Sequence, residues 1–297
     1  MLQRFTARAV VVGDRAGTVV PDAVLDVADG RISWVGPAAE APHAAGAEVV
    51  ELPGVLLPGL VNAHSHAPMV LFRGQGEGLP LDRWLREVMW PREARLTPED
   101  VEVAMTAASA ELLTGGVTTS VEMYFHPERI AAAVTATGAR AVIAAPLIPL
   151  PGLPPFEEQL RAAVDLAAGA TADGRIEYGI GPHAAYTVPL DVLRAAAVAA
   201  REHGLLLHLH VAETASEGAD LLARHSSRSP SSMCTQWAAR TRPPSTSWAA
   251  SRAGTERPCR ASRSSPSVAV SATCRCSSRP CSRASRPASP STGSGTV

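Results

Sequence analysis

The sequence predicts an α/β fold of the (β/α)8 TIM-barrel type, truncated to about five strands, with a small β domain before it and a disordered tail after it. Three observations predict this arrangement. Residues 1–58 contain short β-rich runs, residues 59–225 alternate strand and helix patterns, and residues 226–297 show no periodic pattern. Alternation of strands with helices favours a parallel sheet with right-handed crossovers.

The first 58 residues have the pattern of a small antiparallel sheet. Brief β-rich runs, separated by turn dipeptides that contain glycine, cover residues 9–12, 23–27 and 31–35. We therefore expect a small β-sandwich-like domain over residues 1–58, which need not be complete on its own.

Residues 59–225 have the alternating strand and helix pattern of a partial barrel. A buried strand over residues 55–61 runs into His64, and a helical stretch follows at about residues 80–92. Thr97-Pro98 begins a longer helix, which ends at Gly115-Gly116. Strand and helix patterns then alternate over residues 117–123, 127–137, 140–148, 156–170, 176–181, 189–203 and 205–211. Five apolar strands result, and a closed barrel carries its chemistry at the carboxyl ends of such strands.

The net charge of −1 combines two opposite regions. Residues 1–225 carry −11, with 16 Arg against 27 acidic residues, whereas residues 226–297 carry +10, with 11 Arg against the single Glu256. The tail also contains 20 Ser and 8 Pro but no Leu, Ile, Phe or Tyr, so it cannot bury enough apolar surface to offset its ordering entropy. We therefore predict that this Ser/Arg/Pro-rich tail is disordered.

The tail has the composition that a GC-rich gene yields when it is read out of frame. We hypothesise a frameshift near residues 225–228. The alternative is a functional basic tail that binds nucleic acid through phosphate contacts. We disfavour it because the Arg residues are scattered evenly and lack interleaved aromatic residues other than Trp237 and Trp248.

No apolar run in the sequence reaches the length of a membrane span. The first residues are interrupted by Arg4 and Arg8 and lack the continuous apolar core of a signal peptide. We therefore expect a cytoplasmic protein with no membrane partner.

His64 and His66 follow the first barrel strand directly. In an extended chain, residues two apart face the same way, so both imidazoles would point into the barrel mouth and share one metal ion. Neutral imidazole suits zinc, and also iron, copper or nickel. A lone His-x-His pair is more often two hydrogen-bonded loop histidines, so this motif needs support from elsewhere in the chain.

The fifth strand supplies that support. His208 and His210 lie near its end, where both face one side of the strand, and Glu213 follows just beyond it. Either histidine would provide a third ligand. A metal ion lowers the pKa of a bound water, and a nearby carboxylate can pass its proton to a leaving nitrogen. The alternative for Glu213 is a charge that the N-terminus of the next helix favours.

His183 ends the fourth strand and would also face the barrel mouth. Taken alone, it is better explained as a hydrogen-bonded loop histidine. Histidines at the ends of strands one, four and five together favour a shared site over chance.

Five ordered motifs resemble the amidohydrolase superfamily: PGLVNAHSH, WPREARLT, GVTTSVEMY, GPHAAYTVP and HLHVAET. Over residues 1–225 the chain is most similar to the S-adenosylhomocysteine/5′-methylthioadenosine deaminases and the related triazine chlorohydrolase and guanine deaminase group. The resemblance implies one divalent metal ion, zinc or alternatively iron, held by His64, His66 and His210. It also implies Glu213 as the proton shuttle, and Glu93 and His183 as substrate contacts.

The resemblance decides between two of the alternatives. His210 is preferred to His208 because Glu213 falls three residues after it, which is the family's spacing. Without the family, Glu93 is equally well explained as a solvated charge at a helix end.

The chain departs from the family pattern in three places. The family has a further histidine after the sixth strand and an aspartate after the eighth, and residues 226–297 contain neither residue type. A basic residue often follows the third strand in the nucleoside deaminases, whereas residues 144–147 read Ala-Ala-Pro-Leu. The third departure weakens the case for a nucleoside that carries a carboxylate-bearing side chain.

The expected function is hydrolytic deamination of an aminated purine or nucleoside-type heterocycle, with this chain inactive as written because of the missing residues. The alternatives are a chlorohydrolase of halogenated triazine-type rings, and a non-catalytic remnant with a basic nucleic-acid-binding tail. The resemblance also allows a homo-oligomer for an intact family member.

Overall fold

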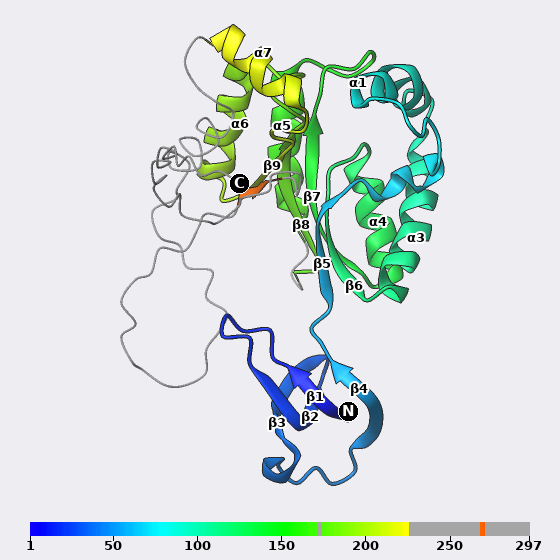
Figure 1. Ribbon diagram of the computed structural model, residues 1–297, viewed down its shortest axis with the longest axis vertical. Coiled ribbons are helices and arrows are strands. Elements are labelled where there is room, and N and C mark those ends of the chain that lie inside the picture. The colour runs from blue at the N-terminus through cyan, green and yellow to red at the C-terminus, as the bar shows by residue number, and fades with distance from the viewer. Residues whose placement is uncertain (171–173, 226–267, 271–297) are drawn as a thin grey trace, which may run out of the picture.

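The chain forms two separate sheets joined by a short connection (Figure 1). The computed structural model describes residues 1–170, 174–225 and 268–270. The N-terminal sheet has four strands in the order β3-β2-β1-β4, and the second sheet has six parallel strands in the order β10-β9-β8-β7-β6-β5. The second sheet carries the candidate site, so the fold matters here mainly through its strand ends.

The N-terminal sheet is mixed rather than antiparallel. Its strands are β1 Leu2–Val11, β2 Val19–Ala28, β3 Arg31–Pro37 and β4 Glu48–Leu56. β1, β2 and β3 pair antiparallel as expected, but β4 pairs parallel to β1, so the antiparallel prediction is wrong for this strand. The segment 38–47 allows this because it carries the chain from β3 across to the far side of β1, which a tight turn cannot do.

The predicted buried strand over residues 55–61 is wrong. Val55 and Leu56 end β4 in the first sheet, and β5 begins only at Leu60 in the second. Pro58 has no backbone N–H to give a sheet, and a Cβ at Gly59 would collide with Thr118, so the chain breaks here. The flanking apolar side chains are exposed, with Leu60 58% accessible.

The second unit alternates strands with helices as predicted. In chain order its elements are β5 Leu60–Ser65, η2 Ala67–Phe72, α1 Leu81–Arg83, η3 Trp84–Met89, α2 Trp90–Glu93, α3 Pro98–Thr114, β6 Val117–Glu122, α4 Pro127–Thr137, β7 Arg140–Leu147, α5 Phe156–Leu166, η4 Ala167–Gly169, β8 Ile176–Pro182, α6 Leu190–Glu202, β9 Leu206–Leu209, α7 Ala215–His225 and β10 Val268–Val270. The predicted helix over 156–170 is shorter, since its last turn is the 3-10 helix η4. The predicted stretch at 80–92 contains the π-helix η3.

Local signals set the helix ends. Thr97 caps α3 by accepting a hydrogen bond from the Asp100 backbone, and Asp100 bonds back to the Thr97 backbone. Gly138 ends α4 with φ of 81°, which a glycine adopts without steric cost. The helices then cover the strands, and the largest cluster of buried apolar residues includes Leu147, Ile180 and Leu193 from β7, β8 and α6.

β10 corrects the prediction that the tail contains no strand. Val268–Val270 pairs parallel to Leu207–Leu209, so β10 adds a short edge strand beside the five predicted strands, which the structure confirms as β5 to β9. The outer edge of β9 offers backbone N–H and C=O groups, and a Val-Ala-Val run is a suitable partner because β-branched residues favour strands. The remaining tail predictions, including the frameshift and the nucleic-acid-binding tail, fall on residues 226–267 and 271–297, outside the described residues.

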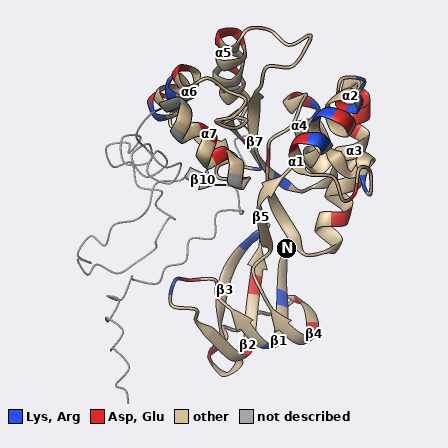
Figure 2. Ribbon diagram, turned by 45° about the horizontal axis from the view of Figure 1, so that its top comes forward, with Lys and Arg blue, Asp and Glu red and all other residues tan. Residues whose placement is uncertain are grey.

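Charged side chains lie mainly on the helices and the N-terminal sheet, as Figure 2 shows for α2, α5 and α6. The parallel strands contain few charged residues by contrast, and β8 buries almost every residue from Ile176 to Pro182. Within the described part of the chain, no helix is both long and apolar enough to cross a membrane.

Gly181 lets β7 and β8 approach closely beside the candidate site. A Cβ there would lie 2.8 Å from the Ala144 carbonyl oxygen and 3.1 Å from that of Ala145. We predict that Gly181→Ala lowers the free energy of unfolding by about 1–3 kcal/mol, the usual effect of overpacking. Urea unfolding followed by circular dichroism measures this. Gly115→Ala is the control, because its nearest contacts lie at 3.4 Å; equal losses in both variants would contradict the close-approach explanation.

Candidate metal centre and substrate pocket

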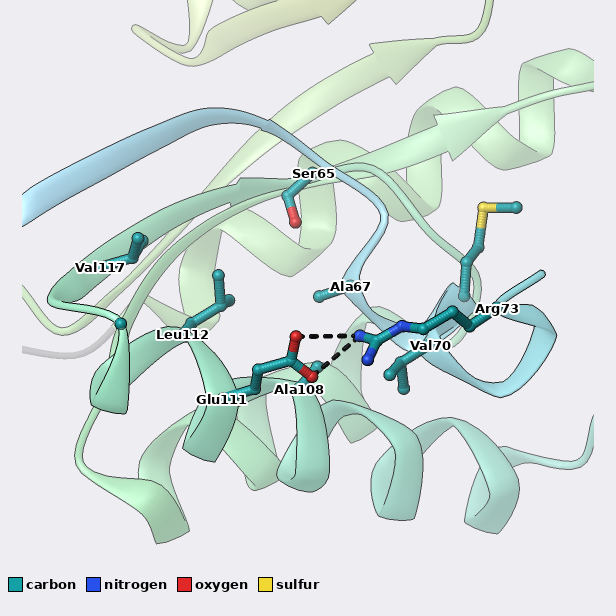
Figure 3. A pocket seen from close by; sticks show the side chains of 10 residues that line it. Ser65, Ala67, Val70, Arg73, Ala108, Glu111, Leu112 and Val117 are labelled. Atoms are coloured by element: carbon teal, nitrogen blue, oxygen red, sulfur yellow. Dashed lines mark hydrogen bonds and ion pairs between the residues drawn. The ribbon is translucent and has the colours of Figure 1, made fainter.

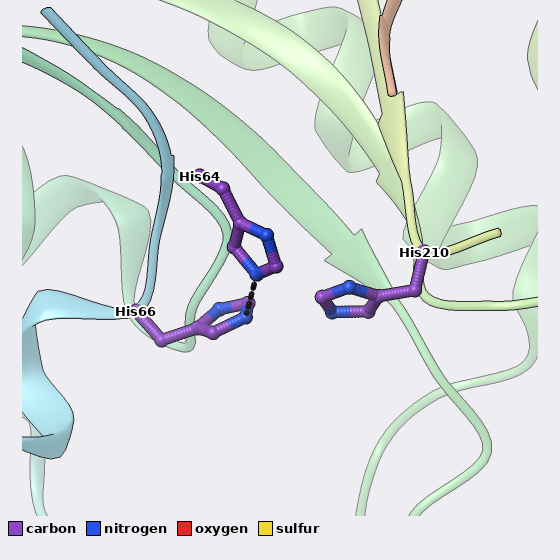
Figure 4. Close-up of side chains that lie close together, drawn as sticks. All are labelled: His64, His66 and His210. Carbon is purple, nitrogen blue, oxygen red and sulfur yellow. Dashed lines mark hydrogen bonds between the residues drawn. The ribbon is translucent and has the colours of Figure 1, made fainter. Parts of the chain in front are cut away.

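Three imidazoles converge at the carboxyl ends of β5 and β9 (Figure 4). The Nε2 atoms of His64 and His66 lie 3.2 Å apart. The ring centroid of His210 lies 5.0 Å from that of His64 and 5.1 Å from that of His66. One nitrogen from each ring lies within 4.8 Å of the other two, so a small rotation of the rings would bring all three to the distance of about 2.0–2.1 Å at which imidazole binds zinc.

The orientation of His66 is fixed by a neighbouring strand. Its Nδ1–H donates to the carbonyl oxygen of Met123 at 2.7 Å, just beyond the end of β6. Because a carbonyl can only accept, the proton is on Nδ1 and the Nε2 lone pair faces His64. A backbone carbonyl on the far nitrogen is the usual second partner of a metal-binding histidine.

His210 is held by the loop after β8. Its backbone N–H donates to the His183 carbonyl at 2.8 Å, and Ala184 forms a parallel bridge with it. The side chain is buried, and its Nδ1 has no hydrogen-bond partner among the described residues. An unpartnered buried nitrogen beside two other imidazoles fits a site that binds a cation.

Burial keeps these histidines neutral. It lowers the pKa of His64 and of His66, and it lowers that of His210 further because His183 and His66 stand beside it. A neutral imidazole keeps the lone pair that a metal ion requires. The donor set and its protonation therefore fit a divalent ion such as zinc.

His183 lies at the edge of the cluster. Its ring centroid is 5.0 Å from that of His210, and its Nδ1 bonds to the Thr187 hydroxyl at 2.8 Å. The Thr187 hydroxyl also donates to the Ala184 carbonyl, so it accepts from His183. Burial lowers the pKa of His183 to about 4, so its Nε2 is an acceptor at neutral pH.

Glu213 lies between β9 and α7 and is partly buried. One carboxylate oxygen accepts a hydrogen bond from the Tyr186 hydroxyl at 2.8 Å. Burial raises the pKa of Glu213; the Tyr186 bond opposes the rise and the charge of Glu217 adds to it. A carboxylate whose pKa is raised toward neutrality is suited to exchange protons.

Glu93 ends α2 and lines the same pocket. Burial raises its pKa, and the neighbouring Tyr124 hydroxyl opposes that rise. The alternative that Glu93 is a solvated surface charge is therefore disfavoured by its burial.

One pocket collects all six residues that the sequence singles out. Its lining is His64, His66, Met69, Leu81, Trp84, Leu85, Trp90, Glu93, Met123, Tyr124, Phe125, Pro146, Ile148, His183, Tyr186, His210 and Glu213. His208 is fully buried behind it and does not line the pocket, which favours His210 as the third histidine. The roles of the six residues remain predictions.

Sequence reasoning missed Tyr186, Tyr124 and the aromatic wall formed by Trp84 and Trp90. Tyr186 falls three residues after His183 in the same motif, and that proximity is the signal that would have indicated it. The two Trp residues lie on η3 and α2, whose contacts with the pocket depend on the tertiary fold.

A separate cavity lies between η2 and α3, beside β5 (Figure 3). It is mostly apolar, and an exposed ion pair of Arg73 with Glu111 closes one side at 2.8 Å. It contains no cluster of titratable groups, so it has no part in the candidate chemistry.

A parallel α/β sheet with imidazoles and carboxylates gathered at its carboxyl edge is the architecture of a metal-dependent hydrolase. The chain belongs to the amidohydrolase family, whose profile matches residues 55–240. The resemblance expected from the motifs is thereby confirmed.

Individual relatives support the same placement. The chain is 39% identical over 215 residues to a 5-methylthioadenosine/S-adenosylhomocysteine deaminase of Symbiobacterium thermophilum, which covers 68% of this chain and 49% of that protein. It thus spans about half the length of the curated relatives it matches. Its fold is similar to a zinc-bound adenosine deaminase from Xanthomonas campestris, with a TM-score of 0.69 and 32% identity over 79% of this chain and 54% of that one.

The fold is also similar to that of an atrazine chlorohydrolase from Arthrobacter aurescens. The TM-score is 0.70 with 20% identity, over 79% of this chain and 58% of that one. At this identity the likeness concerns the fold alone.

The histidine cluster predicts one zinc ion per chain. Substituting His64, His66 or His210 by Ala should weaken zinc binding by more than about 100-fold, since losing even an outer partner of a ligand typically costs 10–100-fold. Competition with a chromophoric chelator measures the affinity. His203→Ala, at the exposed end of α6, is the control and should bind zinc normally. An unchanged affinity in the cluster variants would exclude this metal site.

Proposed function

We propose that this chain carries the metal-binding half of a hydrolytic deaminase that acts on an adenine-type nucleoside. The convergence of three neutral imidazoles with Glu213 in one pocket supports this proposal most strongly. The names of the relatives that share its motifs point the same way.

Each site residue has a defined task in the proposed reaction. A divalent ion held by His64, His66 and His210 would act as a Lewis acid and make hydroxide available near neutral pH. Glu213 takes the proton of the attacking water and delivers it to the amino nitrogen, which leaves as ammonia. His183 contacts the ring, and Glu93 accepts hydrogen bonds from the sugar hydroxyls.

The pocket wall favours an uncharged substrate. Trp84, Trp90 and Phe125 supply aromatic surface, and among the described lining residues the charged groups are carboxylates, with no Arg. A substrate carboxylate in the aromatic part of the pocket would meet like charge and no Arg or Lys side chain among the described lining residues, which costs several kcal/mol when water is excluded. We therefore propose a nucleoside with a neutral 5′ end, such as methylthioadenosine, rather than S-adenosylhomocysteine.

A chlorohydrolase of triazine-type rings is the second candidate, because the same metal-binding edge would serve chloride displacement. It rests on the fold similarity alone. A remnant without catalysis, with a nucleic-acid-binding tail, is the third, and it depends on residues outside the described part of the chain.

A hybrid protein, in which residues 226–297 are replaced by the matching half of a relative, tests the deaminase proposal. Residues 1–225 joined to the remaining half of the Symbiobacterium relative should release ammonia from methylthioadenosine, while the full 297-residue chain should be far less active. Glu213→Gln in the hybrid should lower kcat by about 10²–10⁴, the usual contribution of a general acid–base group. Chloride release from a chlorotriazine without ammonia release would favour the second candidate, and zinc binding without either would refute catalysis.

The pH profile of the hybrid should report Glu213. Only the ionised carboxylate can accept a proton, so kcat/KM should fall as the pH decreases through a pKa above the ordinary Glu value. Tyr186→Phe removes a hydrogen bond that favours the ionised form, so it should move the acid limb to higher pH. Tyr178→Phe, outside the pocket, should leave the limb in place. An acid limb that Tyr186→Phe does not move would exclude Glu213 as its source.

A further inference from the structure

Glu122 is a fully buried carboxylate that the proposed reaction does not use. It ends β6, is 0% exposed and does not line the pocket. A buried carboxylate is costly unless hydrogen bonds compensate for the lost water, so its neighbours indicate what it does.

Glu122 holds the backbone immediately after the histidine pair. Its Oε2 accepts a hydrogen bond from the Ala67 N–H at 2.8 Å, and Ala67 follows His66 directly. At this point the chain leaves β5 and begins η2. The direction in which His66 leaves the strand therefore depends on an acceptor for the Ala67 N–H.

The neighbouring residue, Met123, holds the other side of His66. Its N–H donates to the Ser65 carbonyl at 3.1 Å, and its carbonyl accepts from His66 Nδ1 at 2.7 Å. Glu122 and Met123 thus bond to three successive residues, Ser65, His66 and Ala67. Ordinary strand pairing uses backbone groups alone, whereas this set of bonds also includes the His66 ring and the Glu122 side chain.

We propose that Glu122 is a positioning residue for the metal centre: it orients His66 by accepting the hydrogen bond of the Ala67 N–H. The proposal rests on the proposed function, since it presupposes that His66 binds a metal ion. Glu122 acts through its acceptor oxygen, so a neutral acceptor of the same length should replace it.

The rival explanation is electrostatic. Glu122 lies close enough to His64 for its negative charge to favour a positive charge there. If charge were its contribution, any neutral residue would weaken metal binding equally, whether or not it can accept a hydrogen bond.

Two variants of similar size separate these explanations in the full chain. Glu122→Gln keeps a carbonyl acceptor for Ala67, and the hydroxyls of Ser65 and Ser120, which are buried beside residue 122, can accept from its amide group. Glu122→Met fills the same volume without an acceptor. We expect zinc affinity to be nearly unchanged in Glu122→Gln and to fall about 10–100-fold in Glu122→Met, the usual effect of losing an outer partner. Unfolding in excess chelator shows whether either variant has lost stability that does not depend on metal.

The outcomes are distinct. If the unsubstituted chain binds no zinc, the proposed function itself fails. If it binds zinc and both variants match it, or both weaken equally, the positioning role is wrong. If Glu122→Met does not fold, Glu122→Asp takes its place in the experiment. Its side chain is one methylene shorter, so Glu122→Asp should lose zinc affinity while Glu122→Gln retains it. Equal zinc affinities of these two variants would overturn the proposal.

Discussion

Parallel pairing of the strands is the constraint on which the candidate site depends. Because β5, β8 and β9 run in the same direction, their carboxyl ends meet at one edge of the sheet. His66 and His210 are far apart in the sequence, yet their rings lie 5.1 Å apart. The pairing of β8 with β9 continues beyond the ends of the two strands, where the His210 backbone N–H donates to the His183 carbonyl.

The same edge of the sheet gathers neutral imidazoles and carboxylates in one pocket. Burial holds the imidazoles of His64 and His210 neutral, while Glu93 and Glu213 place two carboxylates in the same pocket. Buried carboxylates without cations are unfavourable, and within the described lining no Arg approaches them. A divalent ion would satisfy both the lone pairs and the negative charge, so the packing and the chemistry of this edge favour the same occupant.

Much of this arrangement could be predicted from the sequence, because it follows from local patterns. The spacing of His64 and His66, and the three residues from His210 to Glu213, are short-range signals that survive into the structure. Three features were missed for lack of such a signal: the parallel pairing of β4, the division of residues 55–61 between two sheets, and β10. Each of these features depends on which strand edge is free to pair. That is known only once the other strands have assembled into a sheet. Glu122 lies within the GVTTSVEMY motif, but no local pattern predicts its role, since its partner Ala67 lies far away in the sequence.

The histidine cluster also has a consequence for how the chain folds. His64 lies near the end of the first strand of the parallel sheet and His66 just beyond it, and His210 follows the fifth strand. An ion bound by all three would therefore connect segments that are far apart in the sequence. The three ligands come together only in the folded sheet, so the ion would bind the folded chain in preference to the unfolded one. Free metal concentration would then shift the folding equilibrium of the whole sheet, by mass action. The metal centre would thus stabilise the folded parallel sheet in addition to serving the reaction.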